Sequence, residues 1–152
     1  MAAPTTFKFG AGYIELGDGG GTEVFTKICG FTQIEVSFEK DLNDTTVPDC
    51  DDPDAPAWTE RDVSALSASF KASGVLAKAA LPLVEAGFLA DNSRNVKIRL
   101  IGGGTGSGTP DRLISGKFHV KHSLKSQRGN KWEIDFSGES DGVVAMTNVA
   151  AV

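Results

Sequence analysis

Residues 33–40 read QIEVSFEK, and within this stretch apolar and polar side chains alternate without a break. Successive side chains of an extended chain point to opposite faces, so Ile34, Val36 and Phe38 share one face and the polar residues share the other. A period of two is typical of a half-buried β-strand. The stretch therefore predicts a strand with one core face and one polar face.

The same period recurs on both sides of this strand. Residues 60–71 predict a second strand, with Leu66, Ala68 and Phe70 pointing inward. A β-hairpin is predicted around the glycine-rich turn at residues 17–21, because glycine tolerates the positive φ of a tight turn. Further strands are predicted over residues 7–16, 22–28, 95–101, 112–122 and 131–138.

One segment has helical spacing instead. Residues 74–90 repeat apolar side chains at the period of a helix, and Ser73 is a suitable N-cap. Pro82 falls inside the segment, so a kink or two short helices are expected. These elements predict a mainly β fold, a β-sandwich or open barrel with one flanking α-helix.

The strands at residues 112–122 and 131–138 are expected to pair across the turn SQRGN. A turn centred near Gln127 places His119 opposite Asp135 and Lys121 opposite Glu133. Other even shifts of register would keep the same faces matched.

Length and charge restrict the function. The 152 residues fit a single domain over residues 1–152, with enough chain for a hydrophobic core. A net charge of -5 argues against affinity for nucleic-acid phosphates. The first ten residues show no signal-peptide pattern, and the most apolar stretch is interrupted by Lys78, Pro82 and Glu85, so no membrane span is expected.

No set of residues predicts a catalytic, metal-binding or phosphate-binding site. Cys29 is expected to be a small buried residue, and a Cys29–Cys50 disulfide is the alternative. His119 and His122 lie three apart on a strand and point to opposite faces, so they cannot share a metal ion. The glycine-rich loop at residues 102–108 lacks the Lys-Ser/Thr and the following helix of a phosphate-binding loop. We expect no enzyme activity, no metal and no cofactor.

Residues 41–59 show neither a strand nor a helix pattern, and a loop of this length in a compact domain is usually functional or disordered. Calcium binding, a solvated spacer and an arm that docks on another subunit are the three readings of this acidic, proline-rich segment. The segment lacks the glycine and the distal glutamate of an EF-hand loop, which argues against calcium binding. A docking arm is favoured, because the prolines limit the conformational entropy that the segment loses when it becomes ordered. The residues assigned to the inter-subunit loop are Asp41, Asp44, Asp49, Asp51, Asp52, Asp54 and Trp58.

The order of these features resembles the tail tube (major tail) proteins of long-tailed bacteriophages, a family that includes the tube proteins of phage lambda and of gene transfer agents. The resemblance covers about residues 5–145. It rests on the polar-faced strand, the acidic DDPDAPAWT at residues 51–59 before a second strand, and the helix leading into Lys97, Ile98 and Arg99. The additional C-terminal immunoglobulin-like domain of the lambda protein is not expected here.

The resemblance implies a structural virion protein that forms hexameric rings stacked into a hollow tube, with the long loop reaching an adjacent subunit or ring. Each subunit is expected to give four strands to a barrel around the lumen, here residues 31–40, 60–71, 112–122 and 131–138. The implied lumen face carries Glu35, Ser37, Glu39, Ser67, Ser69, Lys71, Lys117, His119, Lys121, Glu133 and Asp135. Cross-strand pairing is expected to neutralise the lysines, leaving Glu35 and Glu39 to give a mildly negative wall that DNA slides past.

The implied partners are other copies of the chain and the tape-measure, tail terminator and distal tail proteins. The implied location is the virion tail, after assembly in the host cytoplasm. The ring or inner-tube protein of a contractile injection or secretion system shares this architecture and stays open as an alternative. A calcium-binding β-sandwich is the alternative from a different class.

Overall fold

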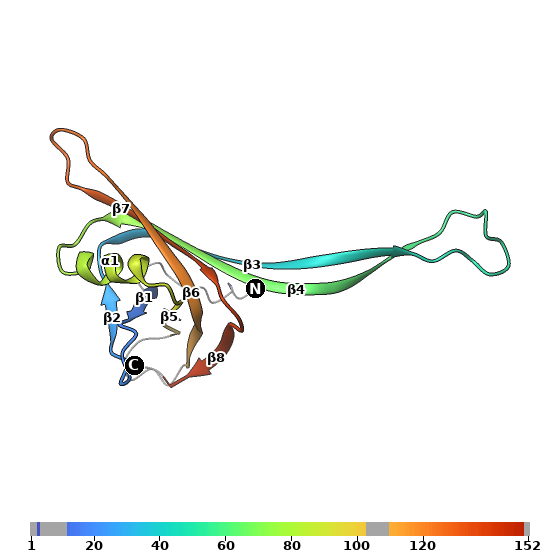
Figure 1. Cartoon of the computed structure of the whole chain (residues 1–152), viewed down its shortest axis with the longest axis horizontal. Coiled ribbons are helices and arrows are strands. Elements are labelled where there is room, and N and C mark those ends of the chain that lie inside the picture. Colours follow the sequence, from blue (N-terminus) through green and yellow to red (C-terminus); the bar gives the residue numbers. More distant parts are fainter. Residues whose placement is uncertain (1–2, 4–11, 103–109, 151–152) are drawn as a thin grey trace.

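The structure is a computed structural model that describes residues 3, 12–102 and 110–150. Within these residues, eight strands and one helix follow one another (Figure 1). Their bounds are β1 Gly12–Gly17, β2 Phe25–Ile28, β3 Phe31–Thr46, β4 Thr59–Val75, α1 Leu81–Leu89, β5 Arg94–Leu100, β6 Asp111–Lys125, β7 Glu133–Ser140 and β8 Ala145–Val149.

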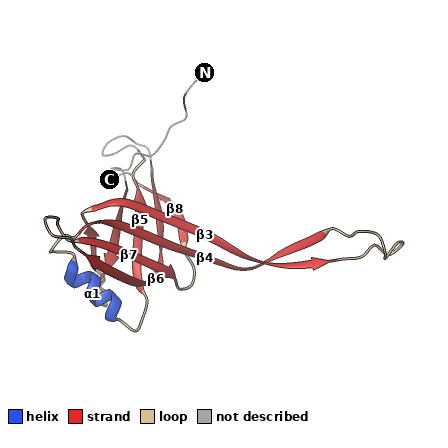
Figure 2. Ribbon diagram, turned by 90° about the horizontal axis from the view of Figure 1, so that it is seen from above, coloured by secondary structure: helices blue, strands red, loops and turns tan. Residues whose placement is uncertain are grey.

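The eight described strands belong to one antiparallel sheet with the order β2-β1-β5-β6-β7-β4-β3, and β8 pairs with β6 beside β7. The first and last strands of this order, β2 and β3, are separated in sequence only by Cys29 and Gly30. Two residues span at most about 10 Å between strand ends, so the sheet must curl until its two ends approach each other. The result is an open barrel with one helix, which confirms the predicted mainly β class (Figure 2).

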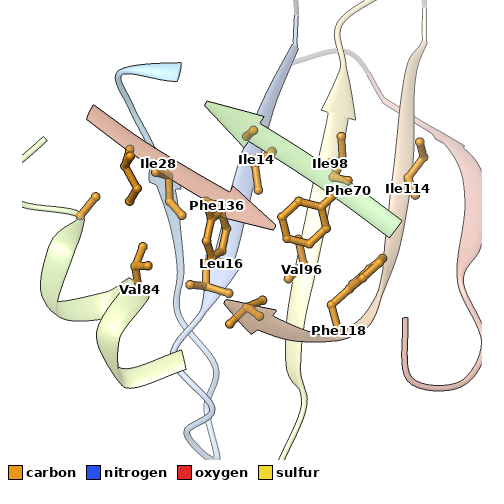
Figure 3. Close-up of a cluster of buried hydrophobic side chains, with 14 of the residues drawn as sticks. Ile14, Leu16, Ile28, Phe70, Val84, Val96, Ile98, Ile114, Phe118 and Phe136 are labelled. Atoms are coloured by element: carbon orange, nitrogen blue, oxygen red, sulfur yellow. The ribbon is translucent and has the colours of Figure 1, made fainter. Parts of the chain in front are cut away.

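The core lies inside this curled sheet. Apolar side chains of β1 and β5 face those of β4, β6 and β7, and α1 adds Val84 (Figure 3). The Phe70 ring packs against Phe118 and Phe136, with ring centroids 5.2 and 5.3 Å apart. Gly138 leaves room for the Phe70 ring, since a Cβ there would lie 2.5 Å from it. In the described part of the chain, Asp111 is the one charged residue that is fully buried, and it accepts a 2.8 Å hydrogen bond from Arg99 Nε.

The turn between β1 and β2 is held by a side chain. Asp18 Oδ1 accepts hydrogen bonds from the backbone N–H groups of Gly20 at 2.9 Å and Val24 at 3.3 Å. These bonds favour the ionised carboxylate and hold the pKa of Asp18 below its ordinary value. The predicted hairpin around residues 17–21 is confirmed, with β1 starting at Gly12 and β2 at Phe25. The predicted strand portion at residues 7–11 lies outside the described residues.

The helix is shorter than predicted. Ser73, Gly74 and Val75 belong to β4, and α1 begins only at Leu81, with Ala80 at the N-cap position and no side-chain cap. Pro82 does not kink the helix, because it occupies the first turn, where its missing N–H has no intrahelical partner to lose. Strand pairing of residues 73–75 with β7 has overridden the helical spacing.

The long loop is also shorter than predicted. β3 continues to Thr46 and β4 starts at Thr59, so the structure reduces the expected loop at residues 41–59 to residues 47–58. The predicted strand at residues 60–71 was too short at both ends. Polar and charged residues at successive positions, such as Glu60, Arg61 and Asp62, hid the pairing from the sequence pattern, because the two strands have no buried face beyond the body.

The junction between β2 and β3 generates a prediction about stability. Gly30 has a φ of +97°, and a Cβ there would lie 2.3 Å from the carbonyl oxygen of Val75, while Val75 N–H donates to Gly30 O at 2.9 Å. Gly129, in the β6–β7 turn, has a φ of +89° with no atom within 4 Å of an added Cβ. Gly30→Ala should therefore combine backbone strain with a steric clash and lower the free energy of unfolding by about 2–4 kcal/mol.

Gly129→Ala is the matched control, because it adds the strain alone, about 1–2 kcal/mol. Urea denaturation followed by circular dichroism measures both. Equal losses in the two variants would show that the β2–β3 junction is not a tight constraint.

Candidate functional site

The most extensive functional candidate is one face of four neighbouring strands, β3, β4, β7 and β6. Residues directly opposite one another on paired strands point to the same side of a sheet. The register therefore sets transverse rows, such as Glu35, Lys71, Ser137 and Lys121, and next to it Ser37, Ser69, Glu139 and His119. We call this surface the polar face.

The polar face lies on the side of the sheet away from the core, because the intervening residues of the same strands, among them Phe70, Phe118 and Phe136, are buried. All eleven side chains predicted from the sequence for a polar lumen face lie on it, namely Glu35, Ser37, Glu39, Ser67, Ser69, Lys71, Lys117, His119, Lys121, Glu133 and Asp135. The structure thus brings the predicted set together on one surface. What that surface faces is a separate question.

The predicted register of β6 and β7 was wrong by four residues. His119 lies opposite Glu139, and Lys121 lies opposite Ser137. Ser123 and Lys125, beyond the predicted strand end, take the positions opposite Asp135 and Glu133, so the hairpin is longer than expected. The faces were nevertheless right, because an even shift of register leaves every side chain on the same side.

The charge partners follow this register. Lys125 Nζ lies 3.6 Å from Glu133 Oε2, and His119 Nε2 lies 3.5 Å from Asp141 Oδ2. Glu35 lies directly opposite Lys71, so it does not stand apart from the lysines as predicted.

Several members of the polar face were not predicted from the sequence. Glu139, Ser137, Ser73, Ser123, Lys125 and Gln33 belong to it. The alternation does continue past Gly138 in β7, but a glycine at a core position interrupts the apolar pattern. The face as a whole carries Glu35, Glu39, Glu133, Asp135, Glu139 and the adjoining Asp141 against Lys71, Lys117, Lys121 and Lys125. Six acidic and four basic groups leave a net charge of -2 with neutral histidine.

The second candidate surface is the long hairpin that β3 and β4 form beyond the body. We call residues 41–66 the arm and residues 47–58 its tip loop. The arm projects far from the barrel (Figure 1). Asp44 forms a 3.1 Å salt bridge with Arg61 across the two strands.

The residues predicted for an inter-subunit loop therefore lie in two different parts of the arm. Asp41 and Asp44 lie on β3, whereas Asp49, Asp51, Asp52, Asp54 and Trp58 lie in the tip loop. All of them are exposed, and Trp58 retains 91% of its accessible surface. Asp49 Oδ1 accepts a 2.8 Å hydrogen bond from the backbone N–H of Asp51, which shapes the turn.

The described residues offer little for ligand chemistry. Within residues 3, 12–102 and 110–150, no group of three or more His, Cys, Asp or Glu side chains is placed to hold a metal ion. A hollow of about 810 Å³ next to residues 90–95 is lined mostly by polar and charged groups, whereas small-molecule sites are predominantly apolar. No helix in the described part of the chain is long and apolar enough to cross a membrane.

The predicted burial of Cys29 was wrong. Cys29 and Cys50 are both exposed free thiols, so Cys29 is not a core residue and the alternative disulfide does not form. Cys29 lies in the connection between β2 and β3, outside the curled sheet. His122 does lie near the core, with its ring 5.8 Å from that of Phe88, on the face opposite His119. The glycine-rich loop falls largely outside the described residues.

Comparison with known proteins matches this chain to one family. The family described as "Phage tail tube protein" matches residues 11–146. Among curated proteins, none matches the chain.

Solved structures share the fold at low sequence identity. The tail of an empty gene transfer agent particle with C6 symmetry superposes with a TM-score of 0.68 at 18% identity, covering 93% of this chain and 99% of that one. The virion of a native gene transfer agent gives 0.65 at 16% identity, with the same coverage. The tube-terminating cap of the anti-feeding prophage gives 0.61 at 10% identity, covering 98% of this chain and 95% of that one.

Proposed function

The chain belongs to the phage tail tube protein family, whose members are structural proteins of the virion, and we propose that its copies assemble as hexameric rings stacked into a tube that conducts DNA. The observation that carries the proposal is the polar face, a continuous four-strand surface turned away from the core and composed of serines and nearly balanced charges. A surface of this kind suits the wall of a water-filled channel.

The edges of this four-strand surface are unpaired in the isolated chain. Of the described strands, only β4 pairs with β3, so the outer edge of β3 is free. On the other side, residues 119–125 of β6 pair with β7 but extend beyond the segment that pairs with β5. Exposed strand edges promote pairing with other chains. In a ring, β3 of one copy would lie beside residues 119–125 of β6 in the next copy.

Strand direction supports this closure. The four strands alternate in direction, and their number is even. A neighbouring copy in the same orientation therefore continues the antiparallel pattern across the interface. Closing the ring in this way removes both free edges at once. The C6 symmetry of the gene transfer agent tail, a protein with the same fold, supports six copies for the ring.

The charge of the polar face fits a conduit. With a net charge of -2 it offers duplex DNA no uncompensated basic patch to which phosphates would bind. We propose that DNA passes along this wall without specific contacts. The tail terminator, tape-measure and distal tail proteins are the proposed partners at the ends and inside the tube, and assembly is proposed to occur in the host cytoplasm.

A tube within a contractile injection system is the second candidate. The fold similarity to the anti-feeding prophage cap and to an extracellular contractile injection system, with TM-scores of 0.61 and 0.57, supports it. A phage or gene transfer agent tail is preferred, because the family match names the phage tail tube and the gene transfer agent structures superpose more closely. Purified tubes that recruit a sheath protein encoded beside this chain would favour the second candidate.

Ring and tube formation is the first prediction of the proposal. The purified protein at high concentration should form hollow tubes with sixfold end views in negative-stain electron microscopy, because each copy carries both edges of the proposed interface. A protein that remains monomeric at every concentration, alone and with its tail partners, would contradict the proposal.

Hydrogen exchange tests which edges meet. In tubes compared with monomers, amides of residues 31–40 and 119–125 should gain protection, because their outer edges become paired. Amides of β5, which is paired on both sides by β1 and β6 in the monomer, serve as the internal control and should change little. Protection gained on β2 instead of β3 would show that the ring uses the other end of the sheet.

Reversing charge on the polar face tests conduction. Glu35→Lys with Glu39→Lys changes the net charge of the face from -2 to +2, so DNA phosphates should be retained and ejection should slow by at least about tenfold at low salt. Single-particle fluorescence of DNA ejection measures the rate, with intact tubes verified by electron microscopy. Glu85→Lys with Asp91→Lys, on and after α1, is the control of equal charge away from this face. Unchanged ejection in the Glu35 and Glu39 variant would argue that another surface lines the channel.

A further inference from the structure

Helix α1 has no polar side, yet part of its surface is open to solvent. Within residues 81–90 the only charged side chain is that of Glu85. One side of the helix packs on the core through Val84, whereas Phe88 and Leu89 retain 55% and 76% of their accessible surface. A helix that is apolar around its whole circumference is normally buried on all sides. The isolated chain therefore covers only one side of α1.

α1 lies next to the segment of β6 whose outer edge no described strand pairs with, residues 119–125. Gly87 packs so closely on Val120 that an added Cβ would lie 2.9 Å from the valine side chain. The Phe88 ring packs edge-on against the ring of His122, with centroids 5.8 Å apart. Val120 and His122 alternate with the polar face, so they point to the core side. α1 thus contacts β6 through core-side groups and leaves its hydrogen-bonding edge open to another strand.

A buried polar atom lies at the same place. Nδ1 of His122 is buried and has no hydrogen-bond partner within residues 3, 12–102 and 110–150. Buried polar side-chain atoms are nearly always hydrogen-bonded, because an unmade bond leaves the cost of desolvation uncompensated. The surface beside Phe88 is therefore incomplete in the isolated chain in polar as well as in apolar terms.

Strand β3 has the complementary gap. Ile34, Val36 and Phe38 point to the core side, but β3 is the last strand of the sheet, and no described strand pairs with its outer edge. Ile34 and Val36 are only partly buried, and Phe38 retains 49% of its accessible surface. Leu66, which was predicted to point inward, also lies on the core side, but it is mostly exposed because it lies beyond the body. The apolar side of β3 thus lacks a cover along its outer edge.

The two incomplete surfaces lie on opposite sides of the polar face. In Figure 2, β3 forms one border of the strands that carry this face, and α1 lies beyond β6 at the other border. In the proposed ring, β3 of one copy lies beside residues 119–125 of the next copy. A strand that continues a sheet keeps its core side on the core side of that sheet. Ile34, Val36 and Phe38 would therefore lie against α1 of the adjoining copy.

We infer that α1 of each copy covers the apolar side of β3 in the neighbouring copy of the same ring. The contact within the ring then has two layers. The strand edges pair in the sheet, and Phe88 and Leu89 pack on Ile34, Val36 and Phe38 on the side away from the polar face. The partner is a second copy of this chain. This inference rests on the proposed ring and assigns the residues that seal it behind the channel wall.

The apolar layer is expected to supply most of the affinity between copies. Hydrogen bonds along a strand edge replace bonds to water, so each contributes little net free energy. Burial of large apolar side chains carries most of the binding energy of an interface. The same layer adds specificity. An open strand edge pairs with many strands, whereas α1 favours one whose core side is apolar.

Removing the apolar groups of α1 tests the contact. Phe88→Ser with Leu89→Ser should lower the fraction of protein in rings at least about tenfold, because both side chains lose their cover on association. The melting temperature of the monomer should change little, since both side chains are largely exposed in it. Sedimentation velocity and negative-stain electron microscopy measure the rings.

Val24→Ser with Val143→Ser is the matched control, because these exposed apolar residues lie in the β1–β2 and β7–β8 connections, away from α1 and β3. This variant should form rings as the wild-type chain does. Normal rings from the Phe88 and Leu89 variant would overturn the inference.

Disulfide trapping tests the contact while most of it is kept. In a Cys29→Ser, Cys50→Ser background, Leu89→Cys on α1 is combined in turn with one of three cysteines on β3, namely Ile34→Cys, Val36→Cys or Phe38→Cys. On oxidation at least one pair should give cross-linked species that end at the hexamer, because a contact within a closed C6 ring has no seventh copy to reach. Val143→Cys with Val36→Cys is the control and should give no cross-linked species.

The products separate the two levels of the argument. Rings that assemble but give no cross-link in any of the three pairs would refute the α1 contact alone. Cross-linked species longer than the hexamer would show that α1 contacts a copy in another ring and would also refute it. The absence of any ring or tube from the wild-type chain would instead refute the proposed function.

Discussion

The fold depends on the tight connection at Cys29 and Gly30, which forces the two ends of an eight-stranded sheet to approach each other. Gly30 and Gly74 make this possible, because a Cβ on Gly74 would lie 2.2 Å from the Gly30 carbonyl oxygen. Once the sheet has curled, β1 and β5 face β4 and β7 across a common core, and the opposite side of β3, β4, β7 and β6 is left to solvent. The polar face is therefore a direct consequence of how the sheet closes.

In β3 and β4, one part of each strand stabilises the core, and the rest of the strand projects from the body and is available for assembly. Along β3 and β4, residues 31–40 and 67–75 contribute to the core, while the continuation of both strands beyond Asp41 and Leu66 contacts no other described element in a buried way. The pairing between the two strands runs unbroken except for the register shifts near Phe31 and Asp41. The core therefore anchors the base of the arm and fixes the direction in which it projects.

The strands and their faces could be predicted from the sequence because they follow from a local property, alternation. It placed all eleven predicted side chains on one surface, since Ile34, Phe70, Phe118 and Phe136 alternate with them in sequence. Register was not accessible, because every even shift between β6 and β7 matches the faces equally well. Nor could helical spacing at residues 74–80 reveal that Gly74 and Val75 pair with Ile134 and Glu133 of β7, a contact between distant segments. The extended arm was missed for a related reason: its alternation is not reinforced by burial.

The charge of the arm also affects how copies of the chain can meet. Two arms brought side by side would place net charges of -7 against each other, a repulsion that opposes a symmetric dimer formed by exchanging hairpins. Contacts that relate unlike surfaces remain, and a polymer built only from these has two different ends. A growing filament of such subunits has an intrinsic direction, so that a factor recognising one end would not recognise the other. In this way the acidic arm would set the polarity of the filament as well as the contacts between its subunits.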